Sequence, residues 1–213
     1  MLWLALHLPL LSLEAFSATL SAEARARPAA LIAEHRVRTV NLAAAERGIR
    51  PGAKRATALA LAADLLLAEA DPARDAAALQ AVAHAALAFT PAVSLHGAQT
   101  VLLEVQASLR LFGGLAALRQ RLLQALAPLG HRVQMAAAPT ALGAALLAQW
   151  VIEPGQADPG DRVLGAHATR LPALQALLDE APVWLLGPGR EHWEALPKTQ
   201  DAAHGIATNG QPS

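Results

Sequence analysis

Residues 93–106 read VSLHGAQTVLLEVQ, and this stretch decides the fold. Two apolar segments, Val93–His96 and Thr100–Gln106, lie on either side of Gly97. A glycine between two such runs is typical of a hairpin, because it adopts the positive φ that tight turns need. The stretch therefore predicts two antiparallel strands.

Four further segments surround this hairpin, two expected as strands and two as helices: Leu2–Leu8, His131–Ala137, Asp71–Phe89 and Leu115–Ala127. Asp71 followed by Pro72 is a strong helix start, with a capping carboxylate and a proline at the first helical position. The order strand, helix, strand, strand, helix, strand predicts an α+β, ferredoxin-like βαββαβ domain.

Residues 11–71 interrupt this pattern and are predicted to form a small, mostly helical module with its own hairpin. Ser12 is expected to cap a helix that runs to about Arg27, where Pro28 stops it. The other expected elements are two strands, a short helix, a turn and a second helix: Ala30–Ala33, Arg36–Val40, the residues before Gly48, Ile49–Gly52 and Lys54–Ala63.

A helix is expected from Pro139 to about Trp150, before a segment rich in glycine and proline. The chain is therefore divided into five parts. A palm-like sheet domain comprises residues 1–10 and 72–152, and an inserted module comprises residues 11–71. A linker (153–170), a helical third part (171–196) and a disordered tail (197–213) follow.

The composition excludes several classes of protein. The 213 residues are 54% hydrophobic, carry a formal net charge of zero and contain no cysteine. This excludes a disordered chain, a disulfide scaffold, thiolate metal sites and cysteine catalysis. The N-terminal apolar run lacks the basic start of a signal peptide, and the run 56–70 is too short and too charged to span a bilayer. A soluble cytoplasmic protein without membrane contact is expected.

The charge is unevenly distributed along the chain. Residues 36–55 contain six basic residues and one acid, whereas residues 150–213 contain eight acids and four bases. The inserted module could therefore meet phosphates. Solvated arginines on helix faces explain the same pattern equally well.

Several motifs resemble those of Y-family, translesion DNA polymerases of the UmuC/DinB type. The stretch LLEVQASLRLFG at 102–113 resembles the palm-strand motif, and GIRPG at 48–52 resembles the fingers turn. The stretches LLDEAPV at 177–183 and LGPG at 186–189 resemble the thumb entry with its DNA-contacting hairpin. The opening stretch LWLALHLPLLSLEAF is most similar to the catalytically degenerate ImuB-like branch. The resemblance implies a polymerase palm, an inserted fingers module and a partial helical thumb.

The same resemblance implies that the catalytic positions have degenerated. Active relatives hold Mg²⁺ with carboxylates on two adjacent palm strands, and the matching positions here are Ala5, His7, Gln99 and Thr100. Residues that grip the triphosphate in the fingers correspond to Leu42 and Ala45, and the stretch 138–145 contains no lysine. No catalytic residue, metal site or cofactor is therefore expected. Glu104 could bind one ion weakly, but a supporting role in the fold explains it better.

Contacts with DNA are expected from the fingers and from the thumb hairpin: Arg50, Lys54, Arg55, Gly187, Gly189 and Arg190. The resemblance implies a non-catalytic DNA-binding adaptor in SOS-induced translesion synthesis, with the sliding clamp and a mutasome polymerase as partners through regions mostly absent here. The alternatives are an active error-prone polymerase and a non-functional truncated fragment. The chain is expected to be C-terminally truncated, because Pro197 to Ser213 does not match the family's continuation.

Residues 106–112 also resemble a short Q-x-x-L-x-L-F peptide that docks on bacterial sliding clamps. Such a peptide needs an exposed, flexible segment. The segment is instead predicted to lie on a palm strand, where Leu109, Leu111 and Phe112 would belong to the core.

Overall fold

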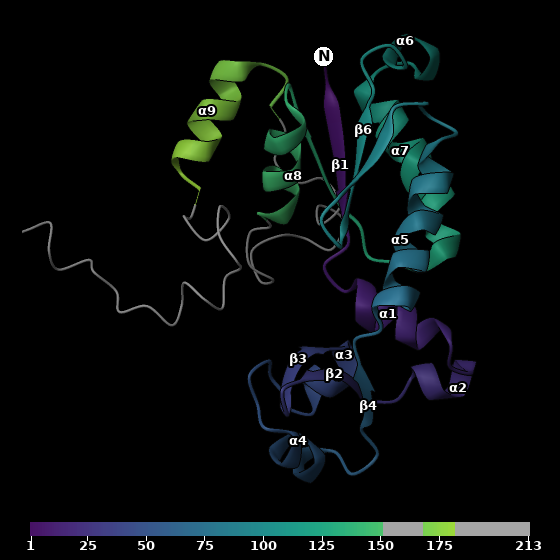
Figure 1. Cartoon of the computed structure of the whole chain (residues 1–213), viewed down its shortest axis with the longest axis vertical. Helices are drawn as coiled ribbons and strands as arrows, with labels where there is room; N and C mark the ends of the chain where they lie inside the picture. Colours follow the sequence, from purple (N-terminus) through teal and green to yellow (C-terminus); the bar gives the residue numbers. More distant parts are fainter. Residues whose placement is uncertain (151–167, 182–213) are drawn as a thin grey trace, which may run out of the picture.

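The computed structural model describes residues 1–150 and 168–181. Within this part of the chain, the strands form a four-stranded sheet and a three-stranded sheet, called the palm sheet and the fingers sheet below. The palm sheet and its helices occupy one end of the molecule, and the fingers sheet occupies the other (Figure 1).

The palm sheet has the predicted ferredoxin-like topology. Its strands are β1 (Trp3–His7), β5 (Val93–His96), β6 (Thr100–Glu104) and β7 (Gln134–Ala138), in the spatial order β5-β6-β1-β7. Every neighbouring pair is antiparallel. The hairpin 93–106 is confirmed, although β6 ends two residues earlier than expected and β7 begins three residues later.

Helices cover both faces of the palm sheet. On one face, α5 (Pro72–Ala86) and α7 (Leu115–Leu126) enclose the largest core, which includes Leu4, Leu6 and Leu103. A short 3₁₀ helix, η1 (Ala127–Leu129), follows α7. The opposite face is covered by α8 (Ala141–Gln149), whose buried alanines pack on the intervening strand residues such as Ala5. This division follows the strict alternation of side chains along β1.

The fingers sheet consists of β2 (Ala29–Ala33), β3 (Arg36–Val40) and β4 (Leu66–Glu69), flanked by α3 (Leu42–Glu46) and α4 (Arg55–Leu61). The predicted hairpin and both helices are present. The third strand was not predicted. It pairs in parallel with β2, from Ala29 opposite Leu66 to Ile32 opposite Glu69, so its partner lies more than thirty positions away in the sequence.

The single helix predicted from Ser12 to Arg27 is wrong. Two helices, α1 (Leu11–Ala18) and α2 (Ala22–Arg25), occupy this stretch. Ser21 caps α2 by accepting a hydrogen bond from the amide of Ala24, whereas Ser12 lies inside α1. Ser21 therefore starts a new helix three residues after α1 has ended at Ala18.

The strand prediction for residues 106–112 is also wrong. The chain turns after Glu104 and forms the short helix α6 (Leu109–Phe112), which ends at Gly113 with φ 80°. Leu111 is 79% exposed, while Leu109 and Phe112 pack against the palm core. Two of the three apolar side chains of the clamp-like pattern are therefore engaged within this chain, and the third is not core.

Helix α9 (Leu171–Asp179) packs on the outer side of α8, as Figure 1 shows. The contact is close at Gly143, where an added Cβ would lie 2.6 Å from Cδ2 of Leu174. The expected tail and most of the expected linker and thumb lie outside the described residues. No helix in the described ranges is long and apolar enough to cross a membrane.

Candidate functional site

The end of the palm sheet nearest the fingers carries a small polar cluster. His7 on β1 stands opposite Thr100 on β6 and opposite Gln134 on β7. The Nδ1 atom of His7 lies 3.0 Å from Oγ1 of Thr100, at hydrogen-bonding distance. Burial lowers the pKa of His7 to about 4, so the imidazole is neutral at pH 7. The two polar side chains thus satisfy one another without any charge.

The positions that match the catalytic residues of active relatives are only partly brought together. His7 and Thr100 are adjacent, and Gln99 precedes β6, where its carbonyl oxygen accepts a hydrogen bond from the amide of Leu8 at 2.8 Å. Ala5 lies two residues before His7 on β1, opposite Leu102, and is fully buried beneath α8. The position of Ala5 therefore belongs to the core and not to the polar cluster.

The residues at this end of the sheet do not fit a magnesium ion. Mg²⁺ requires oxygen ligands, usually carboxylates, in octahedral geometry. Glu104 lies at the opposite end of β6, where its Oε1 atom accepts hydrogen bonds from the amides of Leu2 and Gln106 at 3.3 and 3.2 Å. Among the described residues, no group of three or more His, Asp or Glu side chains is placed to hold a metal ion. Glu104 thus has the supporting role that the sequence favours.

The positions that match the triphosphate-gripping residues of active relatives are apolar. Leu42 opens α3 and is 74% exposed, and Ala45 lies one turn along the same helix. The stretch 138–145 forms the end of β7 and the start of α8, where Thr140 caps the helix through the amide of Gly143. These segments offer no cation to a phosphate group.

The predicted DNA contacts of the fingers lie around a tight turn. Residues 50–53 form a turn in which the amide of Ala53 donates to the carbonyl of Arg50 at 3.2 Å, with Pro51 and Gly52 at its centre. The φ of Gly52 is 85°, as the third position of a type II turn requires. The guanidinium of Arg50 donates to the carbonyl of Ala45 at 3.0 Å, which ties the turn to α3.

Lys54 and Arg55 follow this turn and line a pocket of about 630 Å³ with Arg36 and the hairpin residues Glu34 and His35. Lys54 forms an isolated antiparallel bridge with Arg36, and the amide of Arg55 donates to the carbonyl of His35 at 3.0 Å. The structure brings Lys54 and Arg55 together, while Arg50 lies outside the pocket. The predicted contacts Gly187, Gly189 and Arg190 lie outside the described residues.

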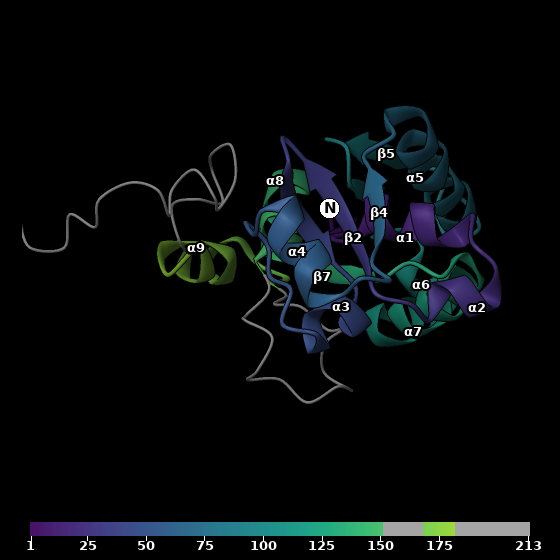
Figure 2. The same ribbon diagram turned by 90° about the horizontal axis from the view of Figure 1, so that it is seen from below.

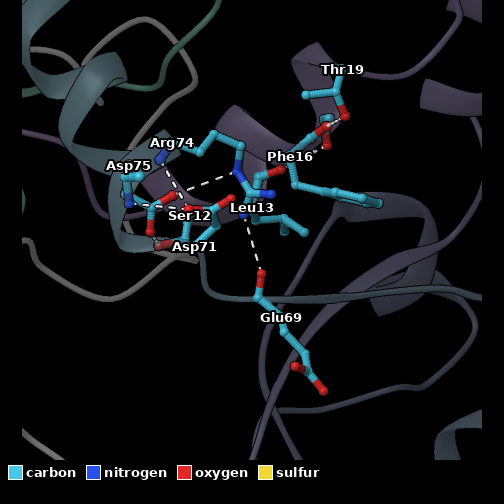
Figure 3. Close-up of polar contacts among 10 residues, drawn as sticks. Ser12, Leu13, Phe16, Thr19, Glu69, Asp71, Arg74 and Asp75 are labelled. Carbon is cyan, nitrogen blue, oxygen red and sulfur yellow. Dashed lines mark hydrogen bonds and ion pairs between the residues drawn. The ribbon is translucent and has the colours of Figure 1, made fainter.

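A polar network joins the fingers to the palm at the start of α5 (Figure 3). The hydroxyl of Ser12 on α1 donates to Oδ2 of Asp75, and Nε of Arg74 lies 3.7 Å from Oδ1 of the same carboxylate. Arg74 also donates to the carbonyl of Glu69 at 3.2 Å. The capping role of Asp71 is confirmed, since its carboxylate accepts from the amides of Ala73 and Arg74 at 3.0 and 3.1 Å.

Helix α1 is also attached to the palm on a second side. Oε2 of Glu14 accepts a hydrogen bond from the amide of Arg132 at 3.0 Å and lies 3.4 Å from Nδ1 of His131. The neighbouring apolar residues divide between two cores, with Leu11 in the palm core and Leu13 against the fingers sheet. The sequence did not predict this junction, because its polar groups come from segments 60 to 120 positions apart.

Comparison with solved structures identifies the fold as that of a Y-family DNA polymerase. An insertion ternary complex of Dbh DNA polymerase superimposes with a TM-score of 0.63 at 15% identity, covering 87% of this chain and 53% of that chain. A Y-family polymerase chimera of Dbh and Dpo4 gives 0.55 at 13% identity, over 70% and 46%. DinB from Sulfolobus solfataricus gives 0.53 at 13% identity, over 70% and 45%.

The family model of the impB/mucB/samB family matches residues 12–149, and this chain belongs to that family. Protein ImuB from Caulobacter vibrioides, in strains NA1000 and ATCC 19089, is 37% identical over 128 residues. The matched region is 60% of this chain but only 28% of ImuB. The chain thus matches about half of the solved polymerases and less than a third of ImuB.

Proposed function

We propose that this protein is a non-catalytic member of its family that binds primer–template DNA and serves as an adaptor in SOS-induced translesion synthesis and DNA repair. The observation that carries the proposal is the His7–Thr100 pair, which is neutral and hydrogen-bonded at the end of the palm sheet. Phosphoryl transfer by a polymerase needs metal-held oxygens and positive charge at this place. Neither is supplied by the side chains described there.

The DNA contacts of this adaptor are proposed on the fingers and on the thumb. Arg50, Lys54 and Arg55 are exposed within the basic segment 36–55. Such side chains bind phosphates without reading sequence, which suits a protein that must act at many lesions. The thumb residues Gly187, Gly189 and Arg190 are proposed as a second contact from the sequence motif alone.

The partners follow from the same proposal. An adaptor without its own chemistry has to place an active polymerase at the lesion, so we propose the sliding clamp and a mutasome polymerase as partners, acting in the cytoplasm. The division into palm (1–10 and 72–152), fingers (11–71) and partial thumb (171–196) belongs to this proposal. Helix α1 complicates the first boundary, since its residues pack in both cores.

Primer extension tests the absence of catalysis. The protein is incubated with a primed template, the four deoxynucleotides and Mg²⁺ or Mn²⁺, with heat-denatured protein and a chosen active polymerase as references. The expected result is no extension beyond the denatured control. Extension that persists after further purification of the wild type, and that is lost in a Thr100→Val variant purified in the same way, would refute the proposal.

A gel shift on primer–template DNA tests the binding function. Arg50→Ala with Lys54→Ala is expected to weaken binding and to lower its dependence on salt, by about 0.7 to 0.9 in logarithmic slope for each lost phosphate contact. Arg47→Ala is the matched control, because Arg47 lies in the same module but pairs with Asp64 at 3.4 Å. If the protein does not bind DNA, or if its binding does not depend on salt, the alternative of a non-functional fragment is favoured.

A further inference from the structure

Helix α6 has an inner face and an outer face. Leu109 and Phe112 are three positions apart, so they share one face of the helix, and both pack against the palm core. Arg110 and Leu111 lie between them and are exposed, Leu111 to 79%. The outer face of α6 therefore combines a cation with a large apolar side chain.

Aromatic contacts hold α6 in place. The ring of Phe112 lies 5.1 Å from that of Phe89, measured between centroids, and this contact joins α6 to the end of α5. The guanidinium of Arg121 on α7 lies 5.8 Å from the centroid of the Phe112 ring, a cation–π contact. Arg121 is exposed, so a second cation stands beside α6. A surface that is already ordered loses little conformational entropy when a partner binds.

The stretch that contains α6 and α7 carries positive charge only. Residues 105–150 include four arginines and no aspartate or glutamate. Within the described ranges, 1–150 and 168–181, Arg110 and Arg121 form no ion pair with a carboxylate. Their charge is therefore left for carboxylates that a partner supplies.

A buried guanidinium adds to this charge. Arg119 on α7 is 5% exposed, yet its Nε and Nη2 atoms have no hydrogen-bond partner among the described residues. Burial lowers the pKa of Arg119, because it removes water from the charged form. Side chains on a helix incline towards its N-terminus, which directs Arg119 along α7 towards Leu115 and α6. An unpaired buried charge is costly, and a carboxylate that reaches it offsets that cost.

This surface is remote from the regions described above. Figure 1 shows α6 at the end of the palm farthest from the fingers sheet. Seen from below, α6 and α7 lie on the opposite side of the molecule from α8 and α9 (Figure 2). Neither the His7–Thr100 pair nor the proposed DNA contacts of the fingers therefore belong to it.

We infer that the outer face of α6 docks an acidic, apolar segment of a partner protein. An apolar side chain of that segment contacts Leu111, and its carboxylates pair with Arg110, Arg121 and Arg119. Arginines around an exposed apolar side chain are typical of protein interfaces. The phosphates of a nucleic acid would neutralise the same cations but would leave Leu111 in water, so a protein is the better occupant. The inference rests on the proposed adaptor role and gives that role a receiving surface on this chain.

Selection from a phage-displayed library of random 12-residue peptides tests the inference. The bait is the full chain, and a Leu111→Glu, Arg121→Glu variant serves for counter-selection. The expected products are peptides that combine aspartate or glutamate with leucine or an aromatic residue. If no peptide is enriched over the variant, or if the enriched peptides lack acids, the inference is overturned.

Fluorescence anisotropy of a labelled, selected peptide then measures the share of each side chain. Leu111→Ala, and Arg110→Ala with Arg121→Ala, are each expected to weaken binding of the peptide about tenfold. Leu61→Ala and Arg132→Ala are the matched controls, because both side chains are exposed and lie away from α6. Equal losses in the controls and in the α6 variants would show a non-specific contact and overturn the inference.

Arg119→Leu separates docking from folding. Because it removes an unpaired buried charge, the thermal midpoint of the free chain should stay the same or rise, while binding of the peptide weakens about 30-fold. A lower midpoint with unchanged affinity for the peptide would assign Arg119 to the fold and overturn its part in docking.

Other occupants of this surface give different results. Competition by duplex DNA as strong as that by unlabelled peptide would show a nucleic-acid surface and overturn the inference. Self-association of the free chain in sedimentation, abolished by Leu111→Glu, would assign the surface to a second copy and also overturn it. A gel shift of primer–template DNA with the same variants keeps the two proposals apart. Loss of peptide binding with DNA binding intact supports docking at α6, whereas absence of DNA binding in the wild type refutes the DNA-binding function alone.

Discussion

The end of the palm sheet and the fingers pocket that Lys54 and Arg55 line both carry polar side chains, but the two regions use them differently. In the palm, His7 and Thr100 satisfy each other through a hydrogen bond and carry no charge at pH 7. In the fingers, Arg36 and Lys54 lie opposite each other, and neither forms an ion pair with a carboxylate of the described residues. The palm cluster therefore contributes to folding, whereas the fingers cluster has binding capacity left for a ligand.

The largest effect on stability is expected where the two regions join. Asp75→Ala removes the partner of Ser12 and leaves the guanidinium of Arg74 without its carboxylate. Because these side chains are mostly buried, the free energy of unfolding should fall by about 2–3 kcal/mol. Chemical denaturation followed by circular dichroism measures this loss. An unchanged midpoint would mean that the two regions are joined by their apolar contacts alone.

Charge reversal in the fingers should separate binding from stability. Lys54→Glu with Arg55→Glu is expected to lower affinity for primer–template DNA by about 30-fold, because phosphate contacts are replaced by repulsion. Both side chains are exposed, so the free energy of unfolding should change by less than about 0.5 kcal/mol. Anisotropy and denaturation on the same preparation check both values. A large loss of stability would show that these cations support the fold.

The palm cluster should respond to pH in a way that the fingers do not. The pKa of His7 is about 4 in the folded chain and about 6.5 when unfolded. The unfolded state therefore takes up a proton first, and stability is complete above pH 6.5 and declines as the pH falls towards 4. Between pH 7 and pH 5 this linkage amounts to about 2 kcal/mol.

Denaturation midpoints of the wild type and of His7→Gln, measured at pH 7, 6 and 5, isolate this contribution. The wild type should lose more stability than the variant as the pH decreases. Parallel profiles for the two proteins would contradict the buried, neutral imidazole.

The smallest effect is expected from the other half of the pair. Thr100→Val keeps the shape of the side chain and removes the hydroxyl that meets Nδ1 of His7. The expected loss is about 1 kcal/mol of unfolding free energy, with DNA affinity unchanged. Thermal unfolding measures the loss of stability, and fluorescence anisotropy measures the DNA affinity. Weaker DNA binding in this variant would show that the palm end takes part in recognition.

Much of the fold follows from local sequence patterns. Asp71-Pro72 fixes the start of α5, and Gly97 separates β5 from β6, so the order of elements predicts the ferredoxin-like sheet. Strand β4 escaped prediction because Leu66–Glu69 has no alternation of its own and becomes a strand only by pairing with β2. Residues 109–112 alternate like a strand, but the left-handed Gly113 closes them into a helical turn.

The candidate sites were predictable to different degrees. A family motif pointed to His7 and Thr100, and the register of β1 with β6 places them side by side. The basic segment pointed to Lys54 and Arg55, but not to Arg36 as their neighbour, since that contact depends on a bridge between residues 18 positions apart. Burial of His7, which sets its pKa, depends on packing that no single segment encodes.

The position of β1 in the sheet also determines the order in which the chain can fold during synthesis. Leu4 pairs with Leu103 on one side and with Ala137 on the other. The first strand to leave the ribosome therefore waits for partners about a hundred residues later, while β2, β3 and β4 are already available to one another. The fingers sheet is complete before the palm sheet can begin, and during that interval the apolar run 2–8 is exposed to chaperones and to aggregation.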